Sequence, residues 1–277
     1  MSVRITSTVF VALLAAYACG GSASPSPASR TPAPAHVFLI VMENHSADEA
    51  LNGPFTASLA ARYGTASDYH AITHPSVPNY LALTSGSTWS IRDDSYHALP
   101  RQDLGSELTA AGVRWRAYME GLTSAGCLDS PTPYDPGHNP FAYYGGACPS
   151  NVVPLSALAG DLAGDTPRFV WIGPDRCHDT HDCAVTTGDD WLRSQVGAIT
   201  ASAAWKSGGV LLITWDEDDD SSNDNRVLTL VITPDAHHRV SARPYTHYSL
   251  LATMEDLLGV ARLGNARGTP AMTDLLP

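Results

Sequence analysis

Three apolar runs of the sequence end in acidic residues. Glu43 with Asn44 follows the first run, Asp175 follows the second, and Asp216 with Glu217 follows the third. Carboxylates that are brought together repel one another, and a divalent cation removes that repulsion. If the three runs are neighbouring strands, these residues predict a metal site built of oxygen ligands.

The acidic segment after the third run allows a second interpretation. Asp216 begins a run of five consecutive acidic residues, and most charge runs are solvated turns. We expect Asp219 and Asp220 to face solvent, whereas Asp216 and Glu217 adjoin an apolar strand. Glu43 taken alone is also compatible with a helix cap or a surface position.

A hydroxyl group at a predicted helix start is the second candidate. Ser76 lies in the segment T-H-P-S-V-P-N, residues 73–79, where a proline suits the first helical turn. A hydroxyl at this position lies near the positive end of the helix dipole, which favours an anion and a more acidic hydroxyl. Ser76 taken alone is more typical of a simple N-cap than of a nucleophile.

The segment D-R-C-H-D-T-H-D-C, residues 175–183, concentrates further ligating groups. It carries three aspartates and two histidines, among them Asp179 and His181, and is dense enough for metal or phosphate chemistry. His178 in the same segment is compatible with a structural role. His247 opens the last predicted helix and would serve as a ligand, an acid or a cap.

The elements that must position these residues alternate between strands and helices. Predicted strands cover residues 36–42, 113–119, 168–172, 209–215 and 227–233, and predicted helices cover 55–63, 78–83, 104–111, 189–201 and 245–258. Continuous apolar runs are typical of strands buried in a parallel sheet. The alternation predicts an α/β fold with a mainly parallel sheet, whose carboxyl edge is the usual ligand site. Residues 121–154, rich in Gly, Pro, Ser and Tyr, are predicted to be a loop insertion.

Composition and charge restrict the classes of function. The chain has 277 residues, of which 44% are hydrophobic, and a net charge of −12. This hydrophobic content is too high for a disordered chain, and the absence of a basic face argues against nucleic-acid binding. Arg4 and the apolar residues 9–16 predict a signal peptide over residues 1–18. Its removal takes away Arg4 and no acid, which leaves a charge of −13.

The segment after the predicted signal peptide suggests export and an anchor. Cys19 is followed by Gly, Ser and Pro residues up to residue 35, which is typical of a lipid-anchored cysteine with a tether. The alternative is a secreted protein with one spare cysteine. We therefore expect an extracellular or lipid-anchored protein, attached to a membrane only through its N-terminal lipid, with a folded domain over residues 36–277.

Four cysteines remain in the predicted mature chain. An even number in an exported protein predicts two disulfides, and four cysteines allow three pairings. We favour Cys127–Cys148 and Cys177–Cys183, because each closes a local loop. The rival possibility, a zinc–cysteine site, lacks the C-x-x-C spacing.

Five motifs follow one another along the chain. They are M-E-N-H-S from Met42, T-H-P-S-V-P-N-Y from Thr73, D-T-H-D from Asp179, T-W-D-E-D-D from Thr214 and H-Y-S-L-L from His247. Taken together and in this order, they resemble a bacterial phosphoesterase family that includes acid phosphatases and phosphatidylcholine-type phospholipases C, and the small secreted acid phosphatases are the most similar branch. The resemblance covers about residues 36–277 and implies an alkaline-phosphatase-like α/β/α sandwich.

The resemblance also implies metal-assisted attack of a hydroxyl on phosphorus. Ser76 would be the nucleophile that forms a phosphoseryl intermediate, and Asn79 would donate to a phosphate oxygen. The metal would be held by the two pairs that follow the first and third apolar runs, namely Glu43, Asn44, Asp216 and Glu217. The expected activity is metal-dependent hydrolysis of phosphate monoesters, as in an acid phosphatase.

Several alternatives stay open at this point. Two-metal relatives imply further ligands, for which Asp175, Asp179, His181 and His247 are the candidates, but a single metal with His181 or His247 protonating the leaving group fits equally well. Oxygen ligands suit Ca²⁺, Mg²⁺ or Mn²⁺, and histidine would admit Zn²⁺ or Fe. A phospholipase C-type phosphodiesterase and a non-catalytic, metal-binding surface lipoprotein are the competing functions.

Overall fold

The computed structural model describes residues 1–3, 36–220 and 224–277. The chain divides into Met1–Thr31 and Pro32–Pro277, and the second unit carries the fold described below. The predicted signal peptide beyond Val3, the tether and Cys19 lie outside the described residues. Within the described ranges, no helix has the length and apolar character needed to span a membrane.

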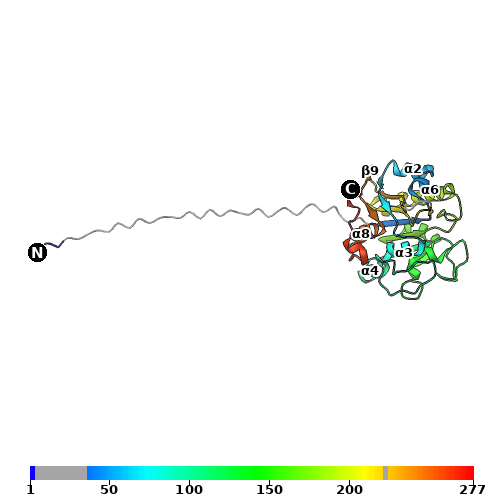
Figure 1. Ribbon diagram of the computed structural model, residues 1–277, viewed down its shortest axis with the longest axis horizontal. Helices are drawn as coiled ribbons and strands as arrows, with labels where there is room; N and C mark the ends of the chain where they lie inside the picture. Colours follow the sequence, from blue (N-terminus) through cyan, green and yellow to red (C-terminus); the bar gives the residue numbers. More distant parts are fainter. Residues whose placement is uncertain (4–35, 221–223) are drawn as a thin grey trace. The chain divides into compact units, whose positions relative to one another are not determined.

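An eight-stranded sheet forms the centre of the folded unit (Figure 1). Its order is β5-β4-β6-β1-β7-β8-β2-β9. The strands are β1 (Val37–Met42), β2 (Gly64–Ala66), β4 (Trp115–Met119), β5 (Val152–Pro154), β6 (Phe169–Gly173), β7 (Val210–Trp215), β8 (Thr229–Ile232) and β9 (Arg239–Ser241). Only β8 runs antiparallel to its neighbours in this sheet. The predicted α/β fold with a mainly parallel sheet is confirmed.

The central strands β1, β6 and β7 are buried along their whole length. This is expected where helices cover both faces of a parallel sheet, and it explains their continuous apolar sequences. A second sheet of two short parallel strands joins β3 (Tyr69–His70) to β10 (Tyr245–Thr246). That pairing brings the segment before Ser76 beside the start of the last helix.

Two layers of helices enclose the large sheet. One face carries α3 (Ser76–Ser85), which packs on α8 (His247–Leu258) and α4 (Leu104–Ala110), and the other carries α2 (Pro54–Ala60) packed on α6 (Val185–Ala201) (Figure 1). The other α-helices of the described residues are short: α1 (Ala47–Ala50), α5 (Leu158–Ala163) and α7 (Ala203–Lys206). Short 3₁₀ helices, η1 to η5, occupy Pro136–His138, Pro140–Ala142, Leu155–Ala157, Gly264–Gly268 and Thr273–Leu275.

Three helix starts differ from the prediction by two residues or more, and one of them is that of α8, which begins at His247 rather than at residue 245. Helix α3 begins at Ser76 rather than at residue 78, so Ser76 is its first residue. Helix α6 begins at Val185 rather than at Asp189. The Asp189 carboxylate instead accepts hydrogen bonds from the backbone N–H groups of Phe55 (2.9 Å) and Thr56 (2.7 Å). Asp189 therefore caps the neighbouring helix α2, which is why it is buried in the middle of its own helix.

Both predicted disulfides are present. Cys127–Cys148 and Cys177–Cys183 have Cα–Cα distances of 5.5 Å and 4.8 Å. The first lies within the predicted insertion, residues 121–154. This segment is not entirely loop, because it contains η1 and η2 and ends in the sheet-edge strand β5.

Candidate active site

The carboxyl ends of β1 and β7 place two acidic residues side by side. The strands pair in register at Met42 and Trp215, so Glu43 and Asp216 leave the sheet together. The backbone N–H of Asp216 donates to the carbonyl of Met42 (3.0 Å), and both carboxyl side chains are fully buried. The parallel pairing of β1 and β7 thus explains why these two acidic residues lie together, as their positions after apolar runs of the sequence predict.

The hydroxyl of Ser76 points into this acidic group from the start of α3. Its Oγ lies 2.9 Å from Glu217 Oε1, 3.3 Å from Glu43 Oε2 and 3.3 Å from Asn44 Oδ1. A hydroxyl has one proton and can satisfy only one of these three oxygens at a time. The remaining contacts bring electron-rich oxygens together, an arrangement that a cation stabilises.

Asn44 and Asn79 hold the acidic residues in place. Asn44 has a φ of 34°, a left-handed conformation that Asn tolerates, and its backbone N–H donates to Asp216 Oδ1 (3.2 Å). The Asn44 amide has two useful orientations: one presents its oxygen to Ser76, and the other lets its nitrogen donate to Asp216 and Glu43. The Asn79 amide nitrogen donates to Glu217 Oε2 (3.1 Å) and to the Thr73 carbonyl (2.7 Å).

The contacts of Asn79 differ from those expected of a side chain that donates to a phosphate oxygen. It is fully buried, and its amide oxygen accepts from the backbone N–H groups of Ile72 (2.9 Å) and Thr73 (3.1 Å). Both ends of the amide are thus engaged. The geometry makes Asn79 a link between the loop before α3 and the Glu217 carboxyl group.

Burial raises the pKa of three carboxyl groups at this site, and repulsion from neighbouring carboxylates raises the pKa of two of them further. Burial raises the pKa of Asp216 to about 7. Burial and then the charge of Asp216 raise the pKa of Glu217 to about 9. The pKa of Glu43 is also raised, first by burial and then by Asp216 and Asp179. Without a positive charge beside them, these groups resist ionisation.

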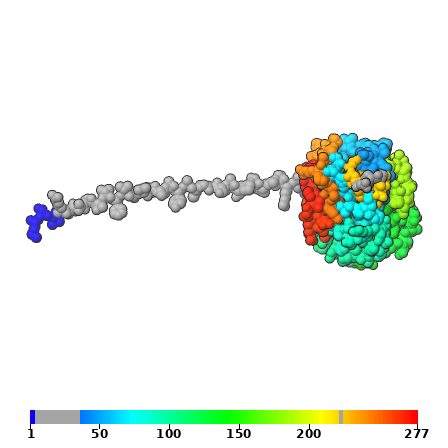
Figure 2. Space-filling view, in the orientation of Figure 1, coloured from blue at the N-terminus to red at the C-terminus, as the bar shows by residue number. Residues whose placement is uncertain are grey.

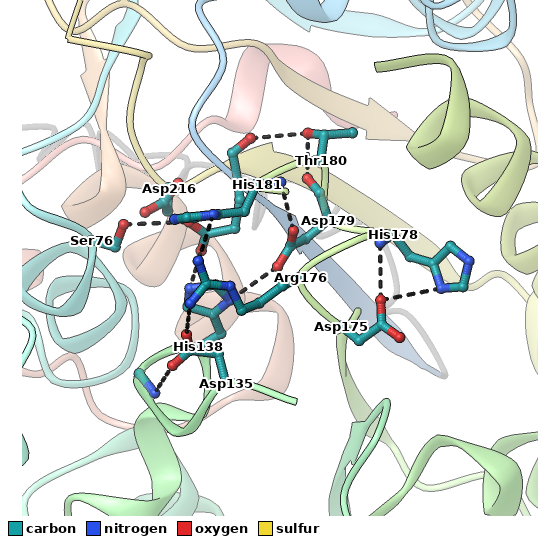
Figure 3. A network of polar contacts seen from close by, with 12 residues as sticks. Ser76, Asp135, His138, Asp175, Arg176, His178, Asp179, Thr180, His181 and Asp216 are labelled. Carbon is teal, nitrogen blue, oxygen red and sulfur yellow. Dashed lines mark hydrogen bonds and ion pairs between the residues drawn. The ribbon is translucent and has the colours of Figure 1, made fainter. Parts of the chain in front are cut away.

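His138 joins this group, although the sequence reasoning did not select it. Its Nδ1 lies 3.0 Å from Asp179 Oδ2 (Figure 3), and its Nε2 lies 3.5 Å from Glu43 Oε1. Tyr80 of α3 stacks on the ring (5.5 Å between centroids) and donates a hydrogen bond to Glu43. Burial alone would lower the His138 pKa, but the hydrogen bond and charge of Asp179 raise it overall.

His74 is a second missed residue. Its Nδ1 lies 2.9 Å from Glu217 Oε2 and its Nε2 lies 3.3 Å from Asp218 Oδ1. The ring is partly exposed and precedes Ser76 by two residues. On the face shown in Figure 2, the yellow chain after β7 reaches the surface beside the cyan segment around α3, consistent with these contacts. The position of His74 inside the T-H-P-S motif was the sequence signal that could have identified it.

The structure places the two predicted histidines differently. His181 is partly exposed, with Nδ1 2.7 Å from Asp182 Oδ1 and its ring 6.0 Å from that of His138. His247 is fully buried, and its two nitrogens contact the Tyr69 hydroxyl (2.9 Å) and the Asp216 carbonyl (2.5 Å). Burial lowers the His247 pKa to about 4, so the ring stays neutral near neutral pH. His247 is thus placed to support the Asp216 backbone, and a ligand or acid role does not fit this geometry.

Asp175 lies away from the Ser76 group. Its Oδ1 accepts from the backbone N–H groups of Cys177 (3.1 Å) and His178 (3.0 Å). Figure 3 shows Asp175 and His178 facing each other, apart from Ser76 and Asp216. The short turn after β6 directs this carboxylate back to its own backbone. Asp179, four residues on, is the residue that reaches His138.

The residues around Ser76 fit a divalent cation. Glu43, His138 and Asp179 offer three ligand atoms within 4.8 Å of one another. On the other side of Glu43 lie the oxygens of Asn44, Asp216 and Glu217. Asp216 Oδ2 is buried and has no hydrogen-bond partner. A buried carboxylate oxygen without a partner, among acids of raised pKa, is an environment that a cation would stabilise.

Comparisons with known proteins identify the family of this chain. A model of the phosphoesterase family matches residues 40–261. A phosphatidylinositol-3-phosphatase of Mycobacterium tuberculosis is 33% identical over 258 residues, covering 90% of this chain and 85% of that protein. An acid phosphatase of Aspergillus fumigatus is 25% identical over 82% of this chain, which spans only 55% of its length. The chain therefore belongs to the phosphoesterase family.

Solved structures give the same fold. A member of the alkaline phosphatase superfamily from Vibrio parahaemolyticus superposes with a TM-score of 0.60 at 12% identity, covering 87% of this chain and 72% of that one. A phosphonate monoester hydrolase from Silicibacter pomeroyi also gives a TM-score of 0.60, at 11% identity, with coverage of 87% and 76%. The predicted alkaline-phosphatase-like fold is confirmed.

Proposed function

We propose that this protein is a metal-dependent phosphatase that hydrolyses phosphate monoesters through a phosphoseryl intermediate at Ser76. The observation that carries the proposal is the position of the Ser76 hydroxyl, at the first residue of α3 and within 3.3 Å of three oxygens of the acidic group. The names of the family relatives, a phosphatidylinositol-3-phosphatase and acid phosphatases, support this class of reaction.

A divalent cation is needed because the predicted mature chain carries a charge of −13, the formal −12 without Arg4, and its substrate is also an anion. Glu43, Asn44, Asp216 and Glu217 would hold it, with His138 and Asp179 as ligands for a second ion beside Glu43. When bound, such an ion supplies the positive charge that acidifies a hydroxyl and offsets the negative charge on the phosphoryl oxygens. The oxygen-rich donors suit Mg²⁺, Mn²⁺ or Ca²⁺, and His138 adds Zn²⁺ to the candidates.

Ser76 then acts as the nucleophile. The Ser76 hydroxyl donates to Glu217 Oε1, with 2.9 Å between the oxygens, and Glu217 would take its proton. Ser76 Oγ forms the new bond to phosphorus as the bond between phosphorus and the ester oxygen breaks. We assign protonation of the leaving oxygen to His181, which is accessible and oriented by Asp182. Attack of water on the phosphoserine releases phosphate and restores the hydroxyl. Asn79 and His247 take positioning roles, on Glu217 and on the Asp216 backbone.

Two disulfides support export, because such bonds persist in oxidising compartments. We propose that residues 1–18 direct export and that Cys19 carries the lipid. The Cys19→Ser variant should then appear in the culture medium, whereas the unmodified chain should stay with the membrane fraction. Equal distribution of both proteins would refute the anchor and leave a secreted enzyme.

The test of the activity compares p-nitrophenyl phosphate with bis-p-nitrophenyl phosphate across a range of pH, before and after chelation. We expect chelator-sensitive monoester turnover that falls by at least about 10³-fold in Ser76→Ala. Ser58→Ala, which alters an exposed serine of α2, is the matched control and should keep full activity. Acid quenching during turnover should trap one phosphoryl group on the unmodified chain and none on Ser76→Ala.

Each other outcome redirects the proposal. Preference for the diester would place the protein with the phospholipase C-type enzymes of its family. Turnover that survives in Ser76→Ala would remove the assigned nucleophile. Metal binding without turnover of either ester would leave a non-catalytic metal-binding protein.

A further inference from the structure

A second group of ligating side chains lies at the same edge of the sheet, outside the Ser76 site. Glu120 follows β4, and Asp175 and His178 lie in the turn that follows β6. Their ligand atoms fall within 4.8 Å of one another. The three residues share no member with the group around Ser76, and Figure 3 shows Asp175 and His178 on the side away from it.

The histidine in this group faces two carboxylates with a single ring nitrogen. His178 Nδ1 lies 3.0 Å from Glu120 Oε2 and 3.4 Å from Asp175 Oδ1. One N–H can point at only one oxygen, so a proton on Nδ1 leaves the other carboxylate without a hydrogen bond from this ring. Metal–ligand bonds of about 2.0–2.1 Å place neighbouring ligands about 2.9–3.4 Å apart in tetrahedral or octahedral geometry. The two observed separations fall within that range.

The surroundings hold the three donors in place. The His178 ring stacks on Trp191 of α6, with 6.1 Å between centroids, which fixes the plane of the imidazole. The backbone N–H of Asp175 donates to Glu120 Oε2 (3.2 Å), and Asp175 Oδ1 accepts from two backbone N–H groups. Hydrogen bonds that orient the ligands in this way are what metal sites require of their supporting residues.

We propose that Glu120, Asp175 and His178 bind a structural divalent transition-metal ion, with water completing its coordination. One imidazole nitrogen with two carboxylates is a donor set for Zn²⁺ or Mn²⁺ and not for an all-oxygen Ca²⁺ site. The side chains of Glu120 and His178 are partly exposed, at 22% and 36%, which leaves room for solvent ligands. The ion joins the end of β4 to the turn after β6.

This site has a consequence for the neighbouring centre. The same turn carries Asp179, which contacts His138, and His181, and it is closed by the Cys177–Cys183 disulfide. A metal at Glu120, Asp175 and His178 would fix the other side of that turn. It would therefore keep Asp179 in position without itself touching a substrate.

The test counts zinc ions bound to the purified chain after equilibrium dialysis against Zn²⁺. We expect His178→Phe, which keeps a ring against Trp191, and Glu120→Gln each to bind one ion fewer than the unmodified chain. His97→Phe is the matched control, because His97 is an exposed histidine that contacts a single carboxylate, Asp93 at 2.8 Å. It should bind as much zinc as the unmodified chain.

A second measurement separates this site from the one at Ser76. Asp216→Asn alters the Ser76 group only, so it should still lose one further zinc ion when His178→Phe is added. Zinc should also raise the thermal midpoint of Asp216→Asn more than that of the double variant. Equal zinc counts for the unmodified chain, His178→Phe and Glu120→Gln would overturn the proposal. Absence of phosphatase turnover would leave these counts unaffected.

Discussion

Asp216 should destabilise the metal-free protein, and its replacement by Asn should reveal this. Burial raises its pKa from 3.8 to about 7, so the folded protein binds this proton more tightly than the unfolded chain does. Stability then falls as pH rises from the unfolded value through the folded one. Asp216→Asn removes the charge, and since Oδ2 has no hydrogen-bond partner, the change from oxygen to nitrogen loses no hydrogen bond there.

The two pKa values give the size of the effect. Each pH unit between them corresponds to about 1.36 kcal/mol, so ionised Asp216 costs up to about 4 kcal/mol above pH 7. For a domain of this size, 1 kcal/mol moves the unfolding midpoint by about 2–4 °C. Metal-free Asp216→Asn should therefore melt roughly 8–16 °C above the unmodified protein at alkaline pH. The difference should vanish below about pH 4, where both side chains are neutral.

A divalent cation should narrow the stability difference between Asp216→Asn and the unmodified protein. Saturation at about a hundred times the dissociation constant stabilises the unmodified protein by about 2.7 kcal/mol, and Asp216→Asn should gain less because it lacks one ligand charge. The assay is thermal unfolding in chelator and in Mn²⁺ as a function of pH. Asp235→Asn, at an exposed position after β8, is the control and should change neither series. If metal-free Asp216→Asn were less stable than the unmodified protein at alkaline pH, burial of an ionised Asp216 would not be the cost that we assign to it.

Three further predictions concern the parts that position the site. Because burial lowers the His247 pKa to about 4, the contribution of His247 to stability should fall by about 3 kcal/mol as pH drops from 6.5 to 4, and the stability difference between the unmodified protein and His247→Gln in urea titrations should change by that amount. Asp189→Ala should lower the free energy of unfolding by about 2–4 kcal/mol, because the N–H groups at the start of α2 lose their hydrogen-bond acceptor. The control is Asp190→Ala, which alters the exposed neighbouring residue and should cost under about 0.5 kcal/mol. Replacing Cys177 and Cys183 together by Ser should lower stability by about 2 kcal/mol, as expected for a short closed loop, in denaturant titrations without reductant.

Residues at strand ends were predictable, because their placement follows from sheet pairing alone. Glu43 and Asp216 follow paired positions of two parallel strands, and a continuous apolar run in the sequence is enough to locate such positions. Ser76 was found through its motif, although the sequence placed the start of its helix two residues late. The two disulfides were predictable on a different ground, because each one closes a short local loop.

His138 was not predictable, because its position depends on tertiary packing. It belongs to the insertion between β4 and β5, and it lies 41 residues before its partner Asp179. The insertion folds back through η1, and the ring stacks on Tyr80 of α3. Asp175 does not join the Ser76 group, and here the reason is local. It does follow a strand, but hydrogen bonds to its own turn hold its carboxylate on another side of that edge.

Glu43 connects all parts of the candidate site. One oxygen accepts from Tyr80 and faces His138, and the other contacts Ser76. A fully buried carboxyl group with three such neighbours is costly to ionise alone and stable only when positive charge and hydrogen bonds reach it together. The helix that carries Ser76 also carries Tyr80, so the element that presents the nucleophile supplies one of these hydrogen bonds. Packing of α3 against the sheet edge therefore also assembles the site, because it brings Ser76 and Tyr80 to Glu43 together.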